Sequence, residues 1–284
     1  MSSARPWRLL LGTGDAGTGA ALEARGARNM GLDDALLESA ANGAPPTLRF
    51  YRWTPSCLSV GRNQPLRGRV DAATIAGFGW DIVRRPTGGL AVLHADEITY
   101  SVAAPVSALG RPRAAYAAIN RALAAGLRAL GLEARVTPPS ATGANRVGAA
   151  TGQVYLNGPE ARCFLTAAPG EVTVSGRKIM GSAQRRRGRA LLQHGSLLLS
   201  GSQAGVGKAL SGAPAGTTPA RAGTSLAAEL GRAPADADIL EALGAAFGEL
   251  LAVGLERAGI TAEEGALAER RAETYSSEAW TWRR

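Results

Sequence analysis

Cys163 and Lys178 are the two side chains of this sequence best suited to covalent acyl transfer. A cysteine attacks as its thiolate, and a nearby ammonium lowers the pKa of a thiol. Lys178 follows Cys163 on a strand that is expected to be adjacent in the sheet, so the two side chains could meet. Residue type alone also allows a plainer interpretation, because most strand cysteines are small buried hydrophobes and most strand lysines are solvated.

Two glycine-containing segments could bring a ligand close to the backbone. Residues 84–94 read RRPTGGLAVLH, and residues 178–184 read KIMGSAQ. Glycine lets a ligand approach the main chain closely, and an arginine beside it can position an anion or a carbonyl group. A glycine hairpin turn with exposed arginines would explain the first segment equally well. His94 and His194 would also fit as core histidines, and Cys57 lies in an apolar strand and is expected to be core.

The elements that must position these residues follow from hydrophobic periodicity. Helices are expected at residues 28–42, 70–77, 113–130 and 239–258, followed by a short charged helix. Strands are expected at residues 7–11, 47–53, 56–61, 80–85, 163–166, 171–174, 177–183 and 190–199. Residues 91–93 and 98–103 are expected to pair as a hairpin, and residues 201–223 to form a connection. Because strands and helices do not alternate as βαβ units, the fold class is predicted to be α+β.

Composition limits the classes of function. The chain has 284 residues and a formal net charge of +9, which favours an acidic protein partner. Nucleic acid is a weaker candidate, because the basic clusters lack interleaved aromatic residues. Two cysteines and two histidines do not suggest a disulfide framework or a metal site. The first apolar run, residues 7–11, is too short for a signal core or a membrane span, so a cytoplasmic protein without membrane association is expected.

Three motifs in order resemble the biotin/lipoate protein ligase and transferase family. They are R-R-x-T-G-G-x-A-V-x-H at residues 84–94, K-x-x-G-S-A-Q at residues 178–184, and H-G at residues 194–195. The resemblance covers most of the chain and is weakest over residues 201–223. It implies a mixed, largely antiparallel sheet flanked by helices, the class II aminoacyl-tRNA synthetase/biotin synthetase-like fold. The catalytic domain would span residues 30–259, with residues 1–29 packing on it and residues 260–284 forming a C-terminal helix and aromatic tail.

Within that family, the sequence is most similar to the cysteine-lysine octanoyltransferases. The resemblance implies that Cys163 carries octanoyl as a thioester and that Lys178 lowers the pKa of its thiol. The donor would be octanoyl-acyl carrier protein, which brings its own phosphopantetheine, so that no bound cofactor or metal is needed. The acceptor would be a lysine of a lipoyl domain on glycine cleavage H protein or on a 2-oxoacid dehydrogenase E2, and the enzyme would be a monomer. The acyl chain is expected beside these residues: Arg85, Gly88, Gly89, His94, Gly181, Ser182 and Ala183.

Other chemistries of the family remain open at this point. ATP-dependent lipoate ligases usually carry a third glycine where this chain has Leu90, and the related transferases often carry arginine there. The Gly-Gly-Leu turn is also similar to that of amidotransferases, which move octanoyl between carrier proteins but usually lack Thr87 and His94. A non-catalytic acyl- or carrier-binding relative would be expected to lack Cys163 or Lys178. The glycine- and arginine-rich loop of biotin ligases is not present.

Overall fold

A mixed sheet forms the centre of the computed structural model, which describes residues 6–12, 23–66, 68–70, 72–138, 167–209 and 223–283. Seven strands make up this sheet, in the order β11-β12-β7-β3-β1-β13, with β2 paired to β3. Their bounds are β1 (Trp7–Leu11), β2 (Glu23–Ala24), β3 (Thr47–Trp53), β7 (Glu97–Pro105), β11 (Met180–Arg187), β12 (Ala190–Leu198) and β13 (Leu255–Arg257). Of the ten strand pairs formed by the described residues, six are antiparallel.

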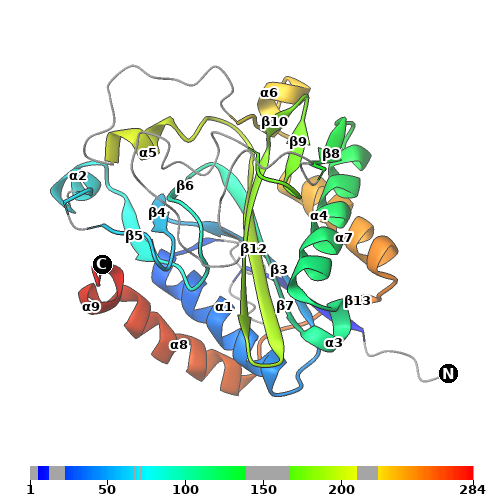
Figure 1. The fold of residues 1–284 in the computed structure, drawn as a ribbon, viewed down its shortest axis with the longest axis horizontal. Helices are drawn as coiled ribbons and strands as arrows, with labels where there is room; N and C mark the ends of the chain where they lie inside the picture. The colour runs from blue at the N-terminus through cyan, green and yellow to red at the C-terminus, as the bar shows by residue number, and fades with distance from the viewer. Residues whose placement is uncertain are drawn as a thin grey trace.

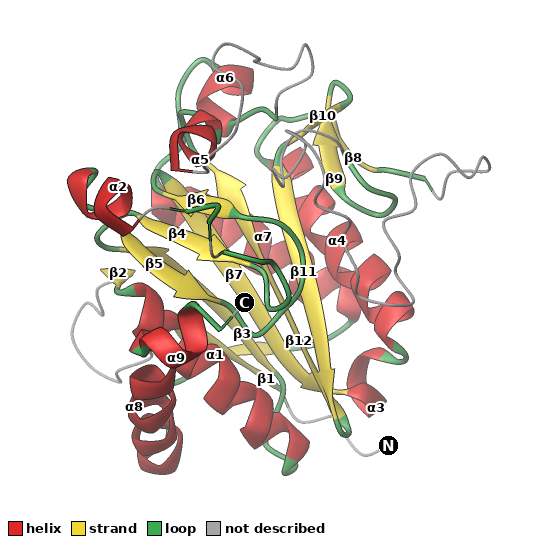
Figure 2. Ribbon diagram, turned by 60° about the vertical axis from the view of Figure 1, so that its left-hand side comes forward, coloured by secondary structure: helices red, strands yellow, loops and turns green. Residues whose placement is uncertain are grey.

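Helices cover both faces of this sheet (Figures 1 and 2). Successive side chains of a strand point to opposite faces, so alternate residues of β3 separate into two sets. Leu48 and Phe50 face α4 (Pro112–Ala129) and α7 (Asp236–Leu251), where they join the largest apolar cluster. Thr47, Arg49, Tyr51 and Trp53 face the other side, where α1 (Gly26–Ala41) lies, with α8 (Ala262–Ser276) packed against α1. Polar and aromatic side chains therefore lie on the face that carries the candidate site.

Two smaller sheets flank the main one. The first has the order β5-β4-β6, from β4 (Cys57–Val60), β5 (Asp81–Arg84) and β6 (Val92–His94). The second has the order β10-β9-β8, from β8 (Ala134–Val136), β9 (Val172–Val174) and β10 (Arg177–Lys178). The remaining helices are short: α2 (Ala72–Gly77), α3 (Val106–Leu109), α5 (Ala204–Ala209), α6 (Leu226–Leu230) and α9 (Glu278–Thr281). None of the described helices is long and apolar enough to cross a membrane.

The predicted α+β class, with a mixed sheet flanked by helices, is confirmed, and three predicted elements are wrong in detail. Residues 91–93 and 98–103 do not pair as a hairpin, because β6 pairs with β4 while β7 pairs with β3 and β12. The helix expected over 239–258 ends at Leu251, where Ala252 takes a positive φ, and the chain continues into β13. The strand expected over 177–183 divides at Ile179 into β10 and β11, which belong to different sheets.

Two further expectations have other outcomes. The strand expected at 163–166 lies outside the described residues. The connection expected over 201–223 contains a short helix, α5.

Candidate active site

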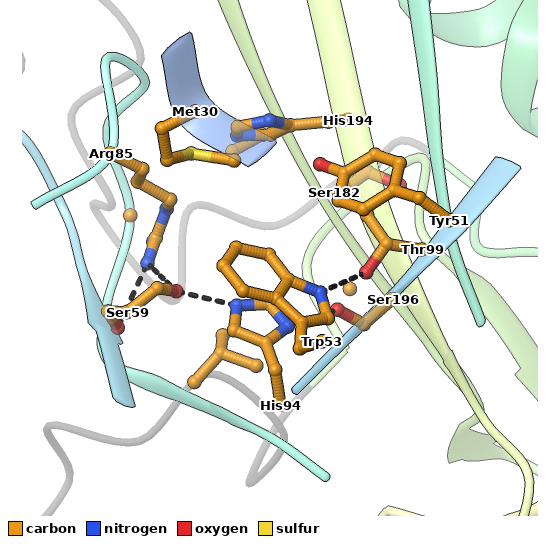
Figure 3. A pocket seen from close by; sticks show the side chains of 15 residues that line it. Met30, Tyr51, Trp53, Ser59, Arg85, His94, Thr99, Ser182, His194 and Ser196 are labelled. Atoms are coloured by element: carbon orange, nitrogen blue, oxygen red, sulfur yellow. Dashed lines mark hydrogen bonds between the residues drawn. The ribbon is translucent and has the colours of Figure 1, made fainter. Parts of the chain in front are cut away.

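An apolar pocket opens between the main sheet, the β5-β4-β6 sheet and α1 (Figure 3). It contains about 430 Å³ of space not filled by atoms, part of it open to solvent. Six of the seven predicted substrate-contacting residues line it: Arg85, Gly89, His94, Gly181, Ser182 and Ala183. Gly88 lies in the adjacent turn without lining the pocket. The two motifs that are about 90 residues apart in the sequence therefore meet at one cavity.

Arg85 holds the glycine turn from inside the protein. Its Nη2 donates to the carbonyl oxygens of Gly88 at 2.9 Å and Leu90 at 2.7 Å. Its Nη1 donates to the hydroxyl of Ser59 at 3.0 Å and to the carbonyl oxygen of the same residue at 3.2 Å. Arg85 is only 5% exposed, so the exposed arginine of a plain hairpin turn is ruled out here. The carbonyl groups that Arg85 positions are therefore backbone groups of the protein itself. Leu90 takes part in the turn through its backbone carbonyl.

His94 forms the floor of the pocket and is held on three sides. Its Nε2 lies 2.7 Å from the hydroxyl of Ser59, and its Nδ1 lies 2.7 Å from Oε1 of Glu97. The indole of Trp53 stacks on the imidazole with ring centroids 3.9 Å apart (Figure 3). Trp53 Nε1 donates to the hydroxyl of Thr99 at 2.7 Å, which in turn donates to the same oxygen of Glu97 at 2.6 Å. This buried carboxylate therefore orders both aromatic rings of the pocket floor.

His194 connects the opposite wall of the pocket to the glycine turn. Its Nδ1 lies 3.0 Å from Oδ2 of Asp33, and its Nε2 lies 2.6 Å from the hydroxyl of Thr87. Burial lowers the pKa of His194, which favours the neutral imidazole. Burial alone would raise the pKa of Asp33, but the hydrogen bond from His194 and the charge of Arg49 hold it below its usual value. His194 is thus a buried, hydrogen-bonded histidine whose second partner belongs to the candidate site.

Arg84, the first residue of the glycine motif, ties this region to the C-terminal tail. Its side chain is fully buried and donates to the carbonyl oxygens of Gly61 at 2.8 Å, Gln64 at 2.7 Å and Thr281 at 2.9 Å. In return, the indole of Trp280 donates to the carbonyl oxygen of Arg84 at 2.8 Å. The aromatic tail therefore packs behind the glycine motif, and the predicted separation of residues 260–284 from the catalytic domain stays a prediction.

Lys178 lies outside the pocket lining and is buried, not solvated. It is 4% exposed, and its Nζ lies 2.7 Å from Oε1 of Glu171. The other oxygen of Glu171 accepts a hydrogen bond from the backbone N–H of Ala168 at 2.8 Å. A buried ammonium needs such a partner, because desolvation disfavours its charged form. Cys163 lies outside the described residues, so its predicted meeting with Lys178 stays a prediction. Among the described residues, no group of histidine, cysteine and carboxylate side chains is arranged to hold a metal ion.

Cys57 is expected to resist alkylation in the folded enzyme. It is fully buried, and burial together with the charge of Asp81 raises the pKa of its thiol. A protonated thiol out of contact with solvent is a poor nucleophile. Iodoacetamide followed by peptide mass spectrometry should leave Cys57 unmodified under native conditions and label it in guanidinium chloride. Native labelling of Cys57 at the rate of a free thiol would contradict its assignment to the core.

Gly195 leaves no room for a side chain between neighbouring strands at the pocket wall. A Cβ atom at this position would lie 2.3 Å from the carbonyl oxygen of Gly181 and 2.8 Å from Cε1 of Tyr100. Both neighbours lie on paired strands, so Gly195→Ala is expected to force a backbone shift that costs about 1–3 kcal/mol of unfolding free energy. Thermal unfolding would measure this loss. Gly77→Ala is the matched control, because nothing lies within 4 Å of a Cβ there and the melting temperature should not fall.

Comparisons with known proteins identify the family of this chain. The model of the lipoyl protein ligase A/B catalytic domain matches residues 25–248, which is most of the chain. The chain belongs to this family. An octanoyltransferase LipM from Kyrpidia tusciae is 36% identical over 98% of this chain and 99% of its own length. A second, from Symbiobacterium thermophilum, is 35% identical over 91% of this chain and 95% of its own length.

Solved structures of other proteins support the fold. A lipoate-protein ligase A bound with ATP superposes with a TM-score of 0.74 at 24% identity, covering 98% of this chain and 99% of its own. The bi-partite lipoate protein ligase from Thermoplasma acidophilum superposes with a TM-score of 0.72 at 22% identity, covering 98% and 96%. The predicted biotin/lipoate ligase fold is therefore confirmed for this member of the lipoyl ligase A/B family.

Several residues of this site were not predicted from the sequence. They are Met30, Asp33, Arg49, Tyr51, Trp53, Ser59, Glu97, Thr99, Glu171 and Ser196. A signal for two of them was present, because Asp33 and Arg49 are opposite charges inside segments predicted to be a helix and a strand with apolar faces. Charged residues at buried positions are rarely left without a partner. That pairing would have identified the polar network behind the pocket.

Proposed function

We propose that this protein is an octanoyltransferase of protein lipoylation, which moves octanoyl from acyl carrier protein to a lysine of a lipoyl domain. The similarity to the octanoyltransferase from Kyrpidia tusciae, 36% identical across 99% of that enzyme, carries the proposal. The pocket supports it, because small residues such as Gly181, Ala183 and Gly195 leave a narrow apolar space suited to a short acyl chain. The acceptor would be H protein or a dehydrogenase E2, and the enzyme would act as a cytoplasmic monomer.

In the proposed first step, the Cys163 thiolate attacks the carbonyl carbon of the octanoyl-phosphopantetheine thioester. A C–S bond to Cys163 forms, the C–S bond to the carrier breaks, and the carrier leaves as a thiol after taking up a proton. The two thioesters are similar in energy, so this exchange needs neither ATP nor a bound cofactor or metal. We propose that the Lys178 ammonium stabilises the thiolate and the developing oxyanion.

In the proposed second step, the ε-amine of the acceptor lysine attacks the Cys163 thioester. A C–N bond forms, the C–S bond breaks, the amine loses a proton, and the Cys163 thiolate is restored. Amide formation from a thioester is downhill, and the covalent intermediate divides one transfer into two easier steps. The charge of +9 gives the enzyme a surface that attracts an acidic carrier protein.

Donor specificity tests this proposal. Octanoyl-acyl carrier protein and an apo lipoyl domain should give octanoylated lipoyl domain without ATP, measured as a mass increase of the acceptor. Free octanoate or lipoate with ATP and Mg²⁺ should give no product. Product only from the free acid with ATP would instead identify a ligase, and product only from octanoylated H protein would identify an amidotransferase.

A further inference from the structure

Asp33 is the centre of a buried polar network that no step of the proposed reaction uses. It lies on α1, is fully buried, and accepts hydrogen bonds from four side chains. Oδ1 accepts from Nη1 of Arg49 at 2.9 Å and from the hydroxyl of Ser101 at 2.8 Å. Oδ2 accepts from the hydroxyl of Tyr51 at 2.9 Å and lies 3.0 Å from Nδ1 of His194. The carboxylate thus holds groups from three strands at once.

The charge of Asp33 decides which nitrogen of His194 carries the proton. An ionised carboxylate only accepts hydrogen bonds, so Nδ1 of the neutral imidazole must be the donor. Nε2 then has a free lone pair and accepts from the hydroxyl of Thr87, 2.6 Å away. Thr87 is 1% exposed, so water does not compete for this bond. A directional chain therefore runs from Thr87 through His194 to Asp33.

This chain ends at the glycine turn of the pocket. Thr87 begins the turn whose Gly89 lines the cavity, and Arg85 already holds the carbonyl oxygens of the same turn from the other side. We propose that Asp33 is a positioning residue for acyl binding: through His194 it fixes the hydroxyl of Thr87 and thereby the place of the Thr87-Gly88-Gly89 turn on the pocket. The network binds the turn without touching the reacting atoms, so its loss raises the KM for the acyl donor more than it lowers kcat.

The tautomer of His194 tests the proton order without any assay of activity. The chain has two histidines, so the ¹⁵N-labelled enzyme gives two imidazole patterns, and a His94→Gln variant assigns them. Long-range ¹H–¹⁵N spectra at pH 7.5 should show His194 neutral, with the proton on Nδ1. An Nε2-protonated or doubly protonated His194 in the wild-type enzyme would overturn the proposal.

Asp33→Asn reverses the proton order in a way that a purely structural role would not. Arg49 only donates, so the amide oxygen of the substituted side chain must stay on the Arg49 side, and the amide NH₂ then faces His194. His194 Nδ1 becomes the acceptor, and the proton moves to Nε2. The spectra of Asp33→Asn should therefore show the other neutral tautomer, and an unchanged Nδ1–H tautomer would overturn the proposal.

Thr87 variants test the far end of the chain and do not disturb Arg49, so they serve even if Asp33→Asn fails to fold. Thr87→Val keeps the shape of the side chain but removes the hydroxyl. The KM for octanoyl-acyl carrier protein should rise about tenfold, as the loss of one buried hydrogen bond implies. The kcat should change less than threefold, which corresponds to ~0.6 kcal/mol. Thr87→Ser restores the hydroxyl and should restore most of the affinity. A KM for Thr87→Val equal to that of wild type would overturn the proposal.

Only this kinetic test rests on the proposed function. If wild-type enzyme transfers no octanoyl from acyl carrier protein, the proposed function fails while the tautomer measurements still decide the role of Asp33. If wild type is active and Thr87→Val has an unchanged KM, the positioning role fails while the proposed function stands. The two failures are therefore distinguishable.

Discussion

Cys163→Ala is expected to abolish both the octanoyl-enzyme adduct and the transfer of octanoyl to the lipoyl domain. Removing the nucleophile of a covalent mechanism removes the only group that accepts the acyl chain, so kcat should fall by about 10³-fold or more. The melting temperature should change little if the role of Cys163 is chemical. Steady-state transfer, followed by the mass of the acceptor, measures the first effect, and calorimetry measures the second.

Cys57→Ala is the matched control for this prediction. Cys57 is buried away from solvent and lines no wall of the pocket, so its replacement should leave the adduct in place and cost only packing energy. A Cys163→Ala enzyme that still transfers octanoyl at the wild-type rate would contradict covalent catalysis by Cys163. If a folded Cys57→Ala enzyme with Cys163 intact formed no adduct, Cys57 would be the nucleophile and the proposal would be contradicted.

Lys178→Met is expected to reduce transfer by about 10²–10³-fold, the usual effect of removing one group that stabilises charge in an active site. The thiol of Cys163 should also react more slowly with iodoacetamide at neutral pH, because loss of the ammonium raises the pKa of the thiol. The same change leaves the buried carboxylate of Glu171 without the ammonium that lies 2.7 Å away. Breaking a buried ion pair in this way costs about 3–5 kcal/mol of stability.

Combining Lys178→Met with Glu171→Gln separates the two effects. The double variant removes both charges of this ion pair, so most of the lost unfolding free energy should return. Activity should remain as low as in Lys178→Met, because the ammonium is still missing. Recovery of transfer together with stability would show that Lys178 serves the fold and not the chemistry.

The sequence predicted elements and motifs well where the signal is local. The helix expected over 113–130 is observed as α4, because its apolar spacing, its proline near the N-terminus and the glycine after it all agree. The segments around Gly89 and Ala183 were expected to share one site, and both line the same pocket. These features depend on residue types within a few positions of each other, or on motifs typical of one family.

Long-range pairing accounts for most of what the sequence did not reveal. Strand β6 has the length and the following turn for a hairpin with β7. It pairs instead with β4, which lies more than thirty residues earlier in the chain. The contact of Arg84 with Thr281, which lies 197 residues later in the chain, does not follow from local spacing either. Each depends on which segments the folded sheet brings together, which one sequence does not specify.

The mass of the enzyme after exposure to the donor alone tests the proposed mechanism most directly. Wild-type enzyme would be mixed with octanoyl-acyl carrier protein, without an acceptor, with and without ATP, and its intact mass and tryptic peptides measured. A gain of one octanoyl group, located on the peptide that contains Cys163 and independent of ATP, is the predicted result. An active enzyme that carries no octanoyl on Cys163, or carries it only when ATP is present, would contradict it.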